Sequence, residues 1–91
     1  MVLNPLSDGS LTGTGTLAVQ SGILGAVLVT ADSSVDVTVK VYKDNSSGPV
    51  IYQIVTKLPI WTPGPIRIDS QVLYYDVSGS GGAAQFFEWV E

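Results

Sequence analysis

A run of alternating residues in the middle of the chain limits most strongly how this protein can fold. In SVDVTVKVYK, residues 34–43, valines at positions 35, 37, 39 and 41 alternate with more polar side chains. Side chains two positions apart share one face of an extended strand, so this segment has an apolar face and a polar face. A polar loop, residues 44–48, separates it from a second run at 49–56. We expect two strands here, with all four valines facing the protein core.

The same period of two recurs along the chain, and no stretch shows the i, i+3, i+4, i+7 spacing of a helix. Further strands are expected at residues 11–20, 23–31, 66–70, 71–78 and 83–91. The segment KLPIWTPGP, residues 57–65, contains three prolines and a glycine, which predicts an ordered, extended connector. Residues 1–10 show no clean period, and we expect an N-terminal arm or an irregular segment there.

Seven or eight short strands with frequent turns predict an all-β, single-domain antiparallel β-sandwich, jelly-roll-like, over residues 11–91. With 91 residues in all, we expect no second domain. The sequence contains neither cysteine nor histidine, so disulfides and the usual structural zinc site are excluded. Core packing or association with other subunits must therefore stabilise the domain.

The charge composition argues against nucleic acid and for association with other proteins. The net charge is −4 with only four cationic residues, whereas nucleic-acid binding needs a basic patch. Charged residues make up 13% of the chain and hydrophobic residues 45%, which leaves a monomer poorly protected against association. The longest apolar run is too short to span a membrane, and the N-terminus does not resemble a signal peptide. We expect no membrane partner and synthesis in the cytoplasm.

The residues needed for catalysis are scarce. The absence of histidine and cysteine excludes Ser–His and thiol catalysis, and Asp36, Asp69, Asp76 and Glu88 are expected on outward strand positions. TGTGT lacks the following helix and the lysine of a phosphate loop. ADSSVD and KDNSSG hold clustered oxygens without the spacing of a calcium loop, so turn formation is the favoured explanation. We expect no enzyme activity, cofactor or metal site.

Two regions are candidates for contact with a partner protein. The strand at 23–29 is apolar on both sides, which indicates burial on both faces or an outer face covered by a partner. Exposed aromatic residues also anchor protein interfaces. The predicted interface residues are Ile23, Val27, Val29, Trp61 and Tyr74.

The last strand alternates between an aromatic face and a face that carries a carboxylate. Phe87 and Trp89 share one side, and Phe86 and Glu88 share the other. Because the side of Glu88 is expected to be wetter, Phe87 and Trp89 are predicted in the core together with Tyr75, and Phe86 is predicted to be partly exposed.

Several motifs between about residues 20 and 91 resemble those of small all-β virion proteins of tailed bacteriophages. They include a Gly-Ile-Leu-Gly strand, a strand ending VKVYKD, the NSSG turn, a proline-rich loop, and VLYYDVSGSGG before a final aromatic strand. The likeness is greatest to the capsid cement, or decoration, proteins. It implies a non-enzymatic viral structural protein on the capsid surface of the virion. It also implies binding to the major capsid protein, a stabilised head, and a homotrimer. No catalytic residues come with the resemblance.

Two other functions remain open. The chain could be a tail, baseplate or fibre component, because similar small sandwiches occur there and contact other virion subunits. A carbohydrate-binding module is a further alternative, in which Trp61 and nearby tyrosines would stack on sugar rings.

Overall fold

The computed structural model describes residues 2–90, which form eight strands and no helix. The strands are β1 (Val2–Pro5), β2 (Gly13–Ala18), β3 (Ile23–Thr30), β4 (Val37–Lys43), β5 (Val50–Thr56), β6 (Ile60–Arg67), β7 (Val72–Ser78) and β8 (Ala83–Val90). Met1 and Glu91, which belong to the segments predicted at 1–10 and 83–91, lie outside the described residues.

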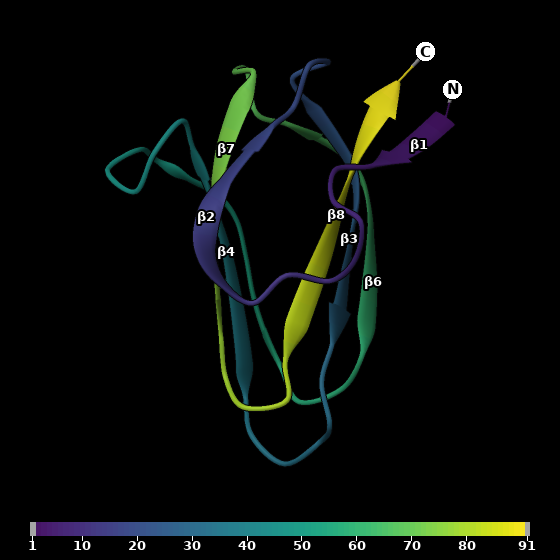
Figure 1. Cartoon of the computed structure of the whole chain (residues 1–91), viewed down its shortest axis with the longest axis vertical. Helices are drawn as coiled ribbons and strands as arrows, with labels where there is room; N and C mark the ends of the chain where they lie inside the picture. Colours follow the sequence, from purple (N-terminus) through teal and green to yellow (C-terminus); the bar gives the residue numbers. More distant parts are fainter. Residues whose placement is uncertain (1, 91) are drawn as a thin grey trace.

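The strands form two four-stranded antiparallel sheets that face each other (Figure 1). One sheet has the order β1-β8-β3-β6 and the other has the order β2-β7-β4-β5. Successive strands therefore tend to cross from one sheet to the other, which is the double Greek-key pattern of a jelly roll. The predicted all-β sandwich is confirmed.

The hydrophobic core lies between the two sheets and consists mainly of branched aliphatic side chains. Val37, Val39 and Val41 are fully buried in it, as their alternation predicts. Each such valine stabilises the fold by roughly 1.5–3 kcal/mol relative to its exposed state. Val35 is 40% exposed and precedes β4, so its predicted place in the core is wrong. The alternating pattern starts at Val35, whereas β4 begins only at Val37.

The beginning of the chain contains a strand, where the sequence predicts an arm or an irregular segment. Residues 2–5 form β1, which pairs with the end of β8. The chain then follows β8: the Leu6 N–H donates to the Phe86 carbonyl, and Leu11 exchanges hydrogen bonds with Ala84. Four residues are too few to show a period, and only the pairing with β8 makes this segment a strand.

The proline-rich segment also differs from its prediction. Residues 60–67 form β6 at the edge of the sheet, and the expected short strand at 66–70 contributes only its first two residues. Prolines fit at an edge because a missing N–H faces no neighbouring strand. Ile66 packs against the core and Ile68 is buried, whereas Arg67 between them is exposed.

A β-bulge in β3 changes which residues face the core. Between Leu24 and Ala26 the register shifts against both neighbouring strands. Leu24 and Val27, three positions apart, are therefore both in the core cluster. A bulge adds one residue and reverses the alternation beyond it. Ile23 consequently lies on the opposite face of the sheet from Val27, although the sequence parity places them together.

Candidate interaction surface

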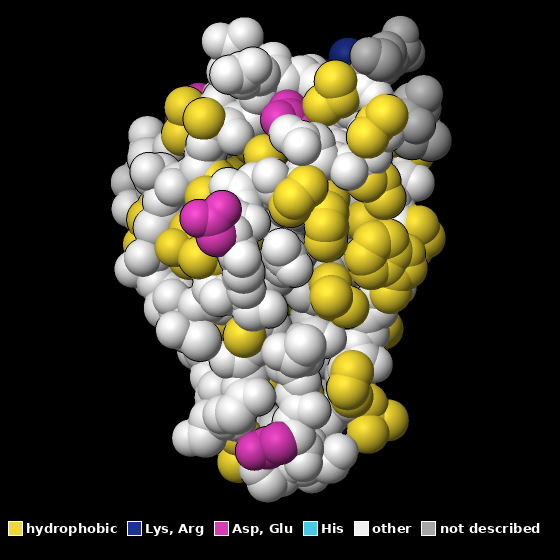
Figure 2. All heavy atoms as spheres, turned by 45° about the vertical axis from the view of Figure 1, so that its right-hand side comes forward, with side chains coloured by type: hydrophobic (Ala, Val, Ile, Leu, Met, Phe, Trp, Pro, Cys, Tyr) yellow, Lys and Arg dark blue, Asp and Glu magenta, His cyan; other side chains and the backbone are white. Residues whose placement is uncertain are grey.

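The outer face of the β1-β8-β3-β6 sheet is covered with apolar side chains, and we call it the apolar face. Residues paired across neighbouring strands point to the same side, so the registers identify its members. They are Leu3, Pro5, Ile23, Ala26, Leu28, Trp61, Pro63, Phe87 and Trp89, and the same registers place Arg67 beside Ile23 and Gln85 beside Leu28 toward its two ends. Figure 2 shows hydrophobic side chains gathered on the side of the molecule that carries β6 and β3 in Figure 1. A sheet face exposed to water normally presents polar side chains, whereas the middle of this face is apolar.

Two aromatic side chains form the centre of the apolar face. The rings of Trp61 on β6 and Phe87 on β8 lie 5.6 Å apart, tilted by 56°, across the intervening strand β3. Trp61 is 47% exposed. Further along, Gly25 leaves room for its neighbours, because a Cβ atom there would meet the side chain of Leu3 and the backbone of Trp89. The result is a nearly continuous apolar layer across the sheet.

The orientation of β8 is the reverse of the sequence prediction. Phe86 is fully buried in the core beside Tyr75, with ring centroids 5.8 Å apart, whereas Phe87 and Trp89 are only partly buried on the apolar face. Only the prediction for Tyr75 is confirmed. The buried Glu88 accepts a hydrogen bond of 3.1 Å from the Ser21 backbone N–H, so the predicted outward position of this carboxylate is wrong. Glu88 therefore lies on the core-facing side of β8, near the end of the strand, with its carboxylate hydrogen-bonded.

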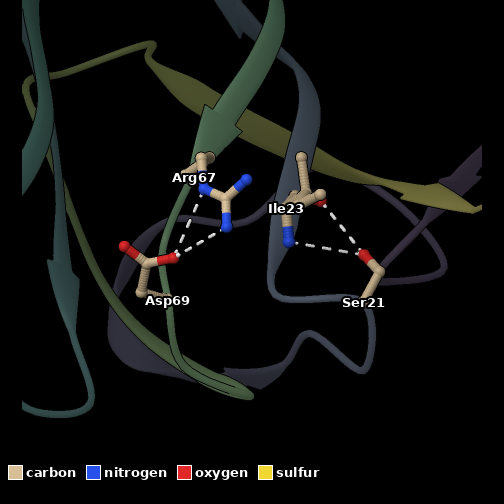
Figure 3. Close-up of polar contacts among 4 residues, drawn as sticks. All are labelled: Ser21, Ile23, Arg67 and Asp69. Carbon is tan, nitrogen blue, oxygen red and sulfur yellow. Dashed lines mark hydrogen bonds and ion pairs between the residues drawn. The ribbon is translucent and has the colours of Figure 1, made fainter.

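A pocket of about 470 Å³ lies at one end of the apolar face. Its lining residues are Ser21, Ile23, Pro65, Arg67, Trp89 and Val90. The guanidinium of Arg67 is 3.4 Å from the Asp69 carboxylate, and both side chains are mostly exposed (Figure 3). The Ser21 hydroxyl donates to the backbone carbonyl of Ile23, two residues later at the start of β3, and accepts from the Ile23 N–H. The polar groups at this pocket are thus already paired within the chain.

The outer face of the β2-β7-β4-β5 sheet is different in character. Thr14, Thr16, Thr38, Lys40, Gln53 and Asp76 share it with several aromatic and aliphatic side chains. Tyr42 and Tyr74 meet edge to face there, with ring centroids 5.7 Å apart. This is the wetter of the two broad faces, as expected for the side of β7 that carries Asp76.

The five predicted interface residues do not form one surface. Ile23 and Trp61 lie on the apolar face, and Tyr74 lies on the opposite side of the sandwich. Val27 and Val29 are fully buried in the core, so their assignment to a partner interface is wrong. The bulge in β3 turns both valines inward, and a glycine inside a strand is the only sequence signal for it.

The residues that sequence analysis missed come from several strands. Leu3, Leu28, Phe87 and Trp89 lie on the apolar face, where β1, β3 and β8 bring them together. Phe87 and Trp89 were missed because the sequence pattern assigns them to the core. Leu3 was missed because residues 1–10 are expected to be irregular. The face as a whole follows from strand order, which alternation within one strand does not reveal.

The acidic and hydroxyl-rich loops show turn hydrogen bonds. Asp32 Oδ1 accepts from the backbone N–H of Ser34 at 3.0 Å and from its hydroxyl at 2.5 Å. Both bonds lower the pKa of Asp32, and the bond from the Ser34 hydroxyl has the larger effect. In the other loop Asn45 Oδ1 accepts from the Ser47 N–H at 2.9 Å. Among residues 2–90, no three acidic side chains gather as a metal site would require.

Comparisons with protein-family models, with curated proteins and with solved structures each find no match to this chain. Over residues 2–90 the structure contains no helix long and apolar enough to cross a membrane. The two outer faces of the sandwich and its edge strands are therefore the features of this protein that point to a function.

Proposed function

We propose that this protein is a non-enzymatic structural subunit that binds other proteins through its apolar face. The main support is the composition of this face, because Trp61, Leu28 and Phe87 lie where a solvated sheet would present polar side chains. Contiguous apolar patches on exposed surfaces mark sites of interaction. A tryptophan and a phenylalanine in contact at the centre are the type of anchor that dominates binding energy at protein interfaces.

The specific role we propose is that of a capsid cement protein of a tailed bacteriophage, located on the capsid surface. Two observations support it: the motif resemblance over residues 20–91, and the jelly-roll strand order, which occurs among viral capsid domains. The partner would be the major capsid protein, and bound copies would hold neighbouring capsid subunits together. Many weak contacts acting at once would stabilise the head against rupture.

The test uses phage heads that lack this protein and measures how much added protein co-sediments with them. Trp61→Ala should weaken binding by roughly thirtyfold, the effect of losing an anchor worth about 2 kcal/mol. Tyr74→Ala is the matched control, because it removes an aromatic ring from the opposite face. We expect it to bind as the unchanged protein does. Equal losses for both variants, or no binding to heads, would contradict the proposal.

The copy number in purified particles separates the head from the tail. A cement protein should be present in a large multiple of the shell symmetry, whereas a tail, baseplate or fibre component should be present in few copies. Quantitative mass spectrometry of intact particles measures this ratio. A low copy number would favour the tail alternative, which uses the same apolar face for contact with another virion subunit.

Carbohydrate binding is the second candidate, and the exposed position of Trp61 favours it. The indole stands on a broad sheet face beside the ring of Phe87, where a sugar ring could stack. Titration with oligosaccharides should then change tryptophan fluorescence, and Trp61→Ala should abolish the change. Fluorescence that stays constant over a panel of sugars would exclude this candidate.

A further inference from the structure

The four edge strands of the sandwich differ in how well they are protected against pairing with another chain. An edge strand exposes unpaired backbone groups, and proline or very short length blocks their use. β6 carries Pro63 and Pro65, and β1 has only four residues and ends at Pro5. Both edges of the β1-β8-β3-β6 sheet are therefore protected. The edges of the other sheet, β2 and β5, have no proline.

Of these two open edge strands, β5 is the better suited to pair with a strand of another chain. Its sequence, VIYQIVT, contains no charge, no glycine and no proline over seven residues. Val50 and Val55 are 48% and 53% exposed. β2 has the sequence GTGTLA, and none of its residues is among the exposed large apolar side chains. Strands that are long, uncharged and rich in β-branched residues pair readily with another strand.

Apolar exposure continues from β5 onto the neighbouring part of the chain. Leu58 in the β5–β6 connection and Ile60 and Trp61 at the start of β6 are also exposed. Together with Val50 and Val55 they include half of the exposed large hydrophobic residues of the described chain. This edge of the sandwich therefore joins an open strand to the apolar face.

We propose that two copies of this protein pair antiparallel along β5 about a two-fold axis. Such a contact is isologous, so one strand must complement itself. With the axis at Gln53, the middle residue of β5, Val50 of one copy lies opposite Thr56 of the other, and no charged residue of the strand meets its equivalent. Lys57, just beyond the strand, lies opposite Pro49. Like charges directly opposite would weaken the pair, and this sequence places none there.

The proposed dimer has a consequence for the apolar face. Antiparallel pairing that keeps the alternation of inward and outward side chains puts the two-fold axis perpendicular to the sheet. The apolar faces of the two copies then point to the same side and form one wider surface. A dimer of this kind binds a flat assembly at two places at once. The strand pairing itself does not depend on the proposed capsid role, and it yields dimers where the resemblance implies trimers.

Sedimentation equilibrium of the purified protein tests the pairing without any particle. We expect a species of twice the 9.6 kDa chain mass that dissociates on dilution. Gln53→Lys places two ammonium groups face to face at the axis, and the dissociation constant should rise roughly tenfold or more. Thr16→Lys is the matched control, since it adds the same charge at an exposed position of β2. It should leave the dimer unchanged.

Mixing charge variants provides the decisive step. Gln53→Glu alone should weaken the dimer as Gln53→Lys does, and an equimolar mixture of the two should restore it as a heterodimer. Circular dichroism confirms that each variant is folded. Amide exchange should also slow along β5, and not along β2, as the concentration of the unchanged protein rises. A monomer at every concentration, a trimer, or a dimer equally sensitive to Thr16→Lys would overturn the proposal.

Discussion

The two adjacent phenylalanines of β8 face opposite sides of the sheet, and comparing them gives the sharpest test of the fold. Phe86 is fully buried between the sheets and touches Tyr75, while Phe87 lies partly exposed on the outer face against Trp61. We expect Phe86→Ala and Phe87→Ala to differ strongly in their effect on the free energy of unfolding. The comparison is well matched, because the two positions share the chemistry of the change and the same strand.

The expected magnitudes follow from these environments. Truncation of a buried phenylalanine removes its transfer free energy and leaves a cavity, at a cost of about 3–5 kcal/mol. Against a total stability of roughly 5–15 kcal/mol, that is a large fraction. Phe87→Ala loses a partly solvated aromatic contact, worth about 0.5–1.5 kcal/mol, and water fills the space that it leaves. At about 4–8 °C per kcal/mol, the melting temperature of Phe86→Ala should fall at least twice as far.

Urea unfolding followed by far-ultraviolet circular dichroism measures both variants on one scale. The slope of free energy against urea should stay the same, so that midpoints can be compared directly. Equal losses, or a larger loss for Phe87→Ala, would show that β8 faces the other way. The apolar face would then consist of the side that carries Phe86 and Glu88.

Three further predictions concern the core and its polar contacts. Val37→Asp should unfold the domain because it buries an unpaired charge, whereas Val35→Asp, at a position 40% exposed, should remain folded; circular dichroism of the pair decides. Glu88→Ala should destabilise the fold by about 1–3 kcal/mol because the Ser21 N–H loses its acceptor, and Glu88→Gln should cost less in the same urea assay. Ser34→Ala should raise the pKa of Asp32 toward its ordinary value in an NMR titration, since the Ser34 hydrogen bonds lower it. Because the folded-state pKa is the lower one, the stabilisation is present above the unfolded-state pKa and is lost as pH falls through the folded value. A Ser34→Ala variant whose Asp32 titrates as before would refute this.

Alternation within single strands predicts much of the core. Val37, Val39 and Val41 are buried as expected, and so is Tyr75 in β7. These assignments succeed because β4 and β7 are the two central strands of their sheet, and the alternation of buried and less buried residues is unbroken from Val37 to Val41 and from Leu73 to Val77. The assignments fail at the bulge in β3, where the backbone is irregular. They also fail at Glu88, because a carboxylate is expected to face water and this one is buried with a hydrogen-bond donor.

The apolar face depends on strand order, which the pattern of a single strand does not reveal. The low charge of the sequence predicts that part of the surface is covered, and two of the five predicted interface residues, Ile23 and Trp61, lie on the apolar face. Leu3, Leu28 and Phe87 join them only because β1, β3 and β8 are neighbours in one sheet, although they are far apart along the chain. That β5 is an open edge strand likewise follows only from the order of the strands in its sheet.

The sequence alone determines that this chain forms short strands, that the alternating valines of β4 are buried, and that histidine and cysteine chemistry are absent, because these properties belong to single residues or to their local period. Only the tertiary structure decides which sheet carries an apolar outer face and which edge strands are left unprotected. Those properties arise from strand order and register, which are set by the packing of all eight strands together.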